Sequence, residues 1–178
     1  MPNNGFDVYT ACPGRSSQFQ LAVPWSSVKD AKGTPDYMNA CSKNKDLAVP
    51  DNFYGFQKAY SDSGYFGLIT YYAFQEAREY LTVPLSNQLI AGKRYTVGFY
   101  VSRADTFKYG TDHFGAYLSK NEPQGQFGID SLKFTPQVNN PTGNVLKDTT
   151  NWTLISGTFI ANGGEKYLTL GNFSDDQN

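Results

Sequence analysis

The segment from Arg94 to Arg103 alternates between two kinds of side chain, and this pattern restricts the fold more than any other feature of the chain. One set is large and apolar and consists of Tyr95, Val97, Phe99 and Val101. The other is mostly small or polar and consists of Thr96, Gly98, Tyr100 and Ser102. Because successive side chains of a strand point to opposite faces, the alternation predicts a half-buried β-strand.

Further stretches rich in β-branched and aromatic residues are candidate strands. They are Phe19 to Val23, Gly64 to Tyr72, Glu79 to Leu85, Phe114 to Ser119, Trp152 to Ala161 and Lys166 to Phe173. A hairpin-type turn at Asn162-Gly163-Gly164 precedes the last of them, and only Ala73 to Tyr80 suits a helical turn. Turn-forming residues are dense from Cys12 to Gln57, which predicts long N-terminal loops.

Strands separated by loops, without alternating helices, favour an all-β fold built as an antiparallel β-sandwich. The composition agrees, since 16% of the residues are aromatic and the chain has 17 Gly and 9 Pro. A length of 178 residues suits one module over residues 1–178.

Charge and composition exclude several functional classes. The net charge of −1 gives no excess of cations to bind a nucleic acid. One histidine, His113, and two cysteines cannot build the usual zinc sites. No run of about 18 apolar residues is present to insert into a membrane, and Met1 to Asp7 does not resemble a signal peptide. The protein is then either cytosolic or has lost a leader.

Catalytic motifs are largely missing, so we do not expect an enzyme. Asp112 and His113 are adjacent, and on a strand they would point to opposite faces. Glu76, Glu79 and Glu165 are the carboxylates available to a glycosidase mechanism. The neighbouring Arg78 and Glu79 suit a structural ion pair better than a substrate clamp.

Several segments, in order along nearly the whole chain, carry a resemblance to a known family. Asn4 to Asp7 is similar to the "N-G-x-F-E" opening of galactose-binding-like jelly rolls, the fold of many carbohydrate-binding modules. The segment Leu89 to Val97 resembles their "L-x-x-G-K-x-Y-x-V" strand. Three further stretches, Thr34 to Cys41, Phe114 to Ser119 and Gly163 to Phe173, are similar to modules at the front of Bacteroidota cell-surface proteins, including outer-membrane and type IX-secreted ones.

This resemblance implies a jelly roll that acts as a noncatalytic, extracytoplasmic module of a longer multidomain protein and binds carbohydrate. Two alternatives stay open: a structural or protein-interaction module of an adhesion, gliding or secretion apparatus, and a glycoside hydrolase. The chain departs from the family at Asp7, where Glu is usual. It also stops at Asn178, before the final strand that such modules have.

Aromatic rings on the concave face or in the loops are the expected glycan contacts, because sugar C–H faces pack on them. These rings are Tyr71, Tyr72, Phe74 and Tyr109, with Arg103, Asp105 and Asn39 as polar partners. Trp25 and Trp152 are expected to pack in the core.

The family often carries structural calcium, and the resemblance places its ligands at Asp7 and Asp62, with Asp175 or Asp176 as poorer candidates. Calcium requires six to eight oxygen ligands, so backbone carbonyls would have to contribute. Solvated turn acids are the alternative.

Cys12 and Cys41 lie 29 positions apart, which is too far for a CxxC redox motif. They are either two reduced thiols or a disulfide that indicates an oxidising compartment. Because a bridge would pin a turn-rich excursion of the chain, we predict the disulfide.

Overall fold

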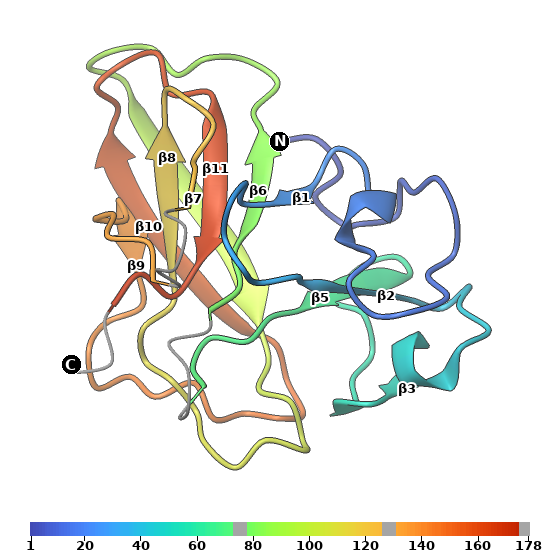
Figure 1. Cartoon of the computed structure of the whole chain (residues 1–178). Helices are drawn as coiled ribbons and strands as arrows, with labels where there is room; N and C mark the ends of the chain where they lie inside the picture. Colours follow the sequence, from blue (N-terminus) through green and yellow to red (C-terminus); the bar gives the residue numbers. More distant parts are fainter. Residues whose placement is uncertain (73–77, 126–130, 175–178) are drawn as a thin grey trace.

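The computed structural model describes residues 1–72, 78–125 and 131–174, and its main body is an antiparallel β-sandwich (Figure 1). One layer is a five-stranded sheet in the order β1-β6-β11-β8-β9. These strands are β1 (Ser26–Ser27), β6 (Leu81–Pro84), β8 (Gly115–Ser119), β9 (Val138–Asn139) and β11 (Tyr167–Gly171). The all-β prediction is confirmed.

The second layer consists of β7 (Arg94–Val101) and β10 (Thr153–Ile160), paired antiparallel along their full lengths. Burial alternates along β7 as the sequence predicts, with every second side chain turned towards the other layer. Three of them, Val97, Phe99 and Val101, pack against the main core between the sheets, which includes Leu81, Val83, Ala116, Leu118, Ile155, Leu168 and Leu170. The sandwich therefore rests on the alternation seen in the sequence.

The N-terminal third lies beside the sandwich as long loops with short elements (Figure 1). Its elements are the 3-10 helices η1 (Phe19–Leu21) and η2 (Lys45–Leu47) and the strands β2 (Asp36–Asn39), β3 (Asp51–Asn52), β4 (Gly55–Phe56) and β5 (Gly64–Gly67). β2 pairs with β5, and β3 with β4. A small core of Met38, Leu47 and Tyr65, with Trp152 packed against it, stabilises this region.

The predicted disulfide is confirmed. Cys12 and Cys41 are bonded, with their Cα atoms 5.6 Å apart. The bond joins the loop before η1 to the end of β2, and it holds together two segments of the N-terminal third.

The outer face of the five-stranded sheet is also covered. Val28, Tyr80, Leu132 and Phe173 form a second core there. Trp25, by contrast, is 2% exposed in the main core, as expected for a framework residue. In the described part of the chain, no helix is long and apolar enough to cross a membrane.

Three predicted strands differ from the structure. The segment predicted as a strand from Phe19 to Val23 contains η1 (Phe19–Leu21) instead. The Ala22 and Val23 N–H groups donate to the Phe19 and Leu21 carbonyls, and Pro24 has no N–H to continue a ladder. The predicted strands from Gly64 and Glu79 are also shorter, as β5 ends at Gly67 and β6 covers Leu81–Pro84. The proposed helical turn from Ala73 lies largely outside the described residues.

The Asn162-Gly163-Gly164 turn does not join a hairpin. β10 pairs with β7, whereas β11 pairs with β6 and β8, so the turn carries the chain from one sheet to the other. Gly163 and Gly164 have φ values of 91° and 88°, which glycine adopts without a Cβ clash.

Candidate functional site

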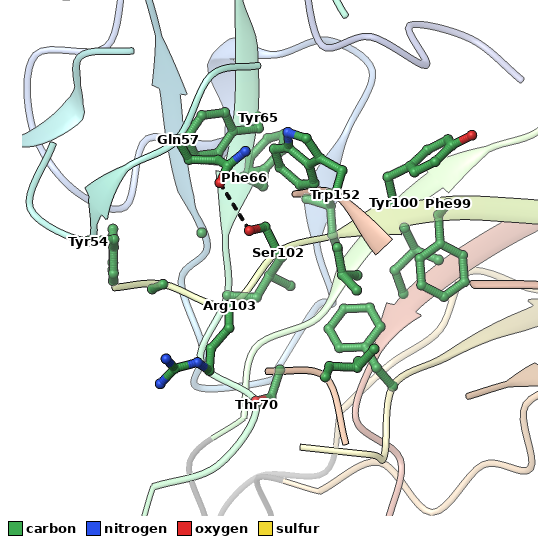
Figure 2. Close-up of a pocket in the computed structure, with 18 of the residues that line it drawn as sticks. Tyr54, Gln57, Tyr65, Phe66, Thr70, Phe99, Tyr100, Ser102, Arg103 and Trp152 are labelled. Carbon is green, nitrogen blue, oxygen red and sulfur yellow. Dashed lines mark hydrogen bonds between the residues drawn. The ribbon is translucent and has the colours of Figure 1, made fainter. Parts of the chain in front are cut away.

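A cavity of about 820 Å³ lies where the N-terminal third meets the sandwich, at the end of β7 (Figure 2). One wall comes from the region of β4 and β5, and the other from β7 and the loop that follows it. Figure 2 shows Phe99 and Tyr100 leaving β7 on opposite sides, so the same strand contributes an inner ring and an outer ring. The cavity volume is within the range of about 300–1,000 Å³ typical of small-molecule sites.

Several exposed tyrosines line the cavity, and we call the solvent-exposed part of its lining the mouth. Tyr109 is 75% exposed, Tyr60 55% and Tyr71 50%. Tyr60 stacks on Tyr100 with ring centroids 3.7 Å apart, and their side-chain hydrogen bond raises the pKa of Tyr60. The mouth thus presents several rings whose faces or edges reach solvent.

A second stacked pair in the cavity lining holds Tyr54 against Phe107 with centroids 5.9 Å apart. The Tyr54 hydroxyl donates to Asp36 Oδ2 at 2.6 Å. Burial, and then this bond, raises the pKa of Tyr54, so its hydroxyl stays protonated at neutral pH. This ring is fixed by its surroundings before any ligand arrives.

Polar groups at the mouth are positioned by the backbone. Arg103 donates through Nε to the Lys147 carbonyl at 3.2 Å and through Nη1 to the Phe107 carbonyl. Asp105 Oδ2 accepts from the Phe56 N–H at 2.9 Å.

Further along the wall, the Ser102 hydroxyl lies 3.0 Å from the Gln57 side-chain amide (Figure 2). Together with Arg103 and Asp105 this offers a ligand both hydrogen-bond donors and acceptors in fixed places.

Asp112 and His113 lie on the cavity wall and contact each other, which corrects the prediction that they point apart. They are in a loop, not a strand, and His113 Nε2 is 3.2 Å from Asp112 Oδ1. Asp112 Oδ2 also accepts from the Gly143 N–H at 2.6 Å. That backbone bond, and to a smaller extent His113, holds the pKa of Asp112 below its ordinary value. The Asp112–His113 contact and the bond from Gly143 hold the loop around Asp112 in place.

The structure brings four of the predicted ligand-binding residues to this cavity, namely Tyr71, Tyr109, Arg103 and Asp105. Tyr72 is 46% exposed but does not line the cavity. Phe74 lies outside the described residues. Trp152 lines the wall and donates its indole N–H to the Lys58 carbonyl at 2.8 Å.

Asn39 is not a ligand contact, because it is fully buried away from the cavity. Its amide nitrogen donates to the hydroxyls of Tyr37 and Ser63 at 2.7 and 3.1 Å, and its oxygen accepts from the Cys41 N–H at 2.9 Å. Burial raises the pKa of Tyr37 to about 12, so its hydroxyl stays protonated and donates to the Phe6 carbonyl. Asn39 therefore cross-links the N-terminal third.

Of the candidate glycosidase carboxylates that the structure describes, neither Glu79 nor Glu165 lines the cavity. Glu79 is buried, and its two oxygens accept from the Thr34 and Ile69 N–H groups at 2.9 and 2.8 Å. Burial raises its pKa. Glu165 is also buried and binds the Asn162 N–H at 2.8 Å, while Glu76 is outside the described residues.

The two calcium candidates, Asp7 and Asp62, are exposed acids. A Cβ added at Gly5 would strike the Asp62 carboxylate, so Asp62 packs against Gly5, which precedes Asp7 by two positions in the sequence. Across residues 1–72, 78–125 and 131–174, no three His, Cys, Asp or Glu side chains come together as a metal-binding group. Calcium binding stays a prediction.

Sequence reasoning missed several cavity residues, including Tyr54, Phe56, Gln57, Tyr60, Tyr100 and Phe107. Only Tyr100 had a usable signal, because the strand alternation turns it away from the core. Phe56 lies in the two-residue strand β4, and the others lie in loops, so none of these segments has a periodic pattern long enough to read.

Comparison with protein-family models, curated proteins and solved structures finds no match to this chain.

Proposed function

We propose that the chain is a noncatalytic binding module that recognises carbohydrate in the aromatic cavity. The observation that carries this proposal is the presence of three exposed tyrosines, Tyr60, Tyr71 and Tyr109, in the lining of a large cavity. Sugar rings have apolar C–H faces that pack on aromatic rings, while their hydroxyls require fixed donors and acceptors.

The polar groups of the mouth suit this task. Arg103 is held in place by two carbonyls and Asp105 by one N–H group, so little side-chain entropy is lost when a sugar hydroxyl binds. Their opposite charges allow them to serve hydroxyls as donor and acceptor.

The arrangement of carboxylates supports a noncatalytic role. Among the described lining residues, Asp105 and Asp112 are the acids, and each already accepts a backbone N–H bond. A glycosidase needs one acid that donates a proton and a second that attacks or activates water.

We also propose an extracytoplasmic location, on a bacterial surface or outer membrane or in secreted form. The Cys12–Cys41 disulfide supports it, since such bonds persist mainly in oxidising compartments.

A protein partner is the second candidate ligand. It is favoured by Leu154 and Ile160, which are 51% and 62% exposed on the outer face of β10, outside the cavity. Leu154→Ser and Ile160→Ser would weaken a protein contact on that face and leave glycan binding in the cavity intact.

The test is a glycan array with the folded protein, followed by calorimetry with the sugars that bind. Each of Tyr71→Ala and Tyr109→Ala should weaken binding by about two- to tenfold, the contribution of one stacked ring. Phe53→Ala is the matched control, because Phe53 is 64% exposed but does not line the cavity. Unchanged affinity in a folded Tyr71→Ala/Tyr109→Ala double variant would contradict the proposal.

A further inference from the structure

The cavity has an apolar floor that belongs to the main core of the sandwich. The residues that both line the cavity and form or pack against that core include Phe66, Leu68, Leu81, Phe99, Leu146 and Leu170. A binding site for sugar alone does not need such depth, because sugar hydroxyls lose hydration without finding partners among aliphatic carbons.

The floor arises from the unequal layers of the sandwich. Five strands face only two in the described chain, so the inner face of β6 near Leu81 extends beyond the cover that β7 and β10 provide. Phe66 of β5 and the loop residues Phe6 and Leu68 cover the remainder, and the cavity runs between them and β7.

Asn172, which lines the cavity beside Leu170, is already hydrogen-bonded. The Asn172 amide nitrogen donates to the Thr70 carbonyl at 2.9 Å, and its side-chain oxygen accepts from the Ser174 N–H at 2.9 Å. The Asn172 carbonyl accepts the Tyr80 hydroxyl at 2.6 Å. An apolar group that enters beside Asn172 would therefore not break a hydrogen bond of this side chain with water.

We propose that the cavity takes an amphiphilic ligand, with an alkyl tail on the floor and a neutral polar head at the mouth. The tail follows from the floor residues alone. That the head is a sugar rests on the proposed function, since the head would lie among Tyr71, Tyr109 and Arg103.

The test compares alkyl glycosides that differ only in tail length, namely methyl, hexyl and octyl β-D-glucoside below their micelle concentrations, together with 1-octanol. Each methylene buried on the floor should tighten binding about fourfold, so octyl should bind about fifteenfold more tightly than hexyl. Calorimetry measures the affinities, and the intrinsic fluorescence of Trp25 and Trp152, which both line the cavity, provides a second signal. 1-Octanol should compete with octyl glucoside.

Leu68→Trp should fill the floor and weaken octyl glucoside binding at least tenfold, with Leu68→Phe as a smaller change if the first variant does not fold. Ile90→Trp adds the same ring at a site that is 53% exposed and lines neither wall, and it should leave the affinity unchanged.

The outcomes separate this inference from the proposed function. Equal affinities for hexyl and octyl glucoside, or full binding by a folded Leu68 variant, would overturn the amphiphile even if glycans bind. Binding of octyl glucoside and 1-octanol without any glycan on the array would uphold the apolar floor and overturn the carbohydrate proposal.

Discussion

Removal of the Cys12–Cys41 disulfide should lower the free energy of unfolding by about 3–4 kcal/mol. The bond closes a loop across a sequence separation of 29. Loop-closure entropy for that length predicts a stabilisation of this size at 25 °C, exerted by restricting the unfolded chain.

The loss of stability should result from greater freedom of the unfolded chain and not from damage to the folded structure. Cys12 is exposed, so replacing its sulfur creates no buried cavity. The same segments remain joined by the Ser42 hydroxyl, which donates to the Pro13 carbonyl at 2.7 Å, and by the Asn44 amide, which donates to the Gly14 carbonyl at 3.1 Å. The loop should keep its native path in the Cys12→Ser/Cys41→Ser variant.

Guanidinium unfolding followed by tryptophan fluorescence measures the difference, with the slopes of the two curves compared. Ser42→Ala is the control, since it removes one bond across the same segments and should cost about 1 kcal/mol. A double serine variant that loses no more than this control would refute the loop-entropy argument.

Two further predictions concern single buried or bridging side chains. Tyr80→Phe removes a hydroxyl that donates to the Asn172 carbonyl at 2.6 Å and accepts from the Leu132 N–H at 2.9 Å. It should lower the free energy of unfolding by about 2–4 kcal/mol, because both buried backbone groups lose their partner. A denaturant midpoint equal to that of the wild type would refute this. Asp112→Asn should destabilise the protein above the ordinary Asp pKa of 3.8, because the Gly143 N–H lowers the pKa of the carboxylate in the folded protein. The difference in unfolding free energy from the wild type should shrink as the pH falls through that lowered pKa. A difference that does not change with pH would contradict this.

The strands were predictable where the pattern is local. Along β7 the alternation of side chains alone defines which face is buried, and both Arg94 and Val101 lie within the predicted segment. The strand predicted from Phe19 was wrong, because the prediction followed the apolar residues and gave too little weight to Pro24. Proline has no N–H group to donate to a neighbouring strand.

Strand pairing was not predictable from turns. The two glycines before β11 are typical of a hairpin, yet β11 finds its partners in β6 and β8, more than 40 residues away in sequence. The core between the layers decides this pairing, and no short segment contains that information.

The site was partly predictable. Tyr71 was selected because it follows a predicted strand, where one of two neighbouring tyrosines must face away from the core, and Tyr109 because nothing in its loop requires a ring. Both line the cavity. Asn39 was misplaced because its burial depends on Tyr37 and Ser63, which β2 and the segment before β5 bring together. The stacked pair of Tyr60 and Tyr100 joins a loop to β7 across 40 positions, a contact that only the fold creates.

Amide chemical-shift mapping by NMR tests most directly whether the cavity is the binding site. Titration with octyl β-D-glucoside, and with any glycan that the array identifies, should shift amides of the mouth around Tyr71 and Tyr109 and of the wall from Phe99 to Arg103. The loop around Ile90, which lines neither wall, should be unaffected. Shifts confined to the outer face of β10, or absent from the cavity at saturating ligand, would contradict the account.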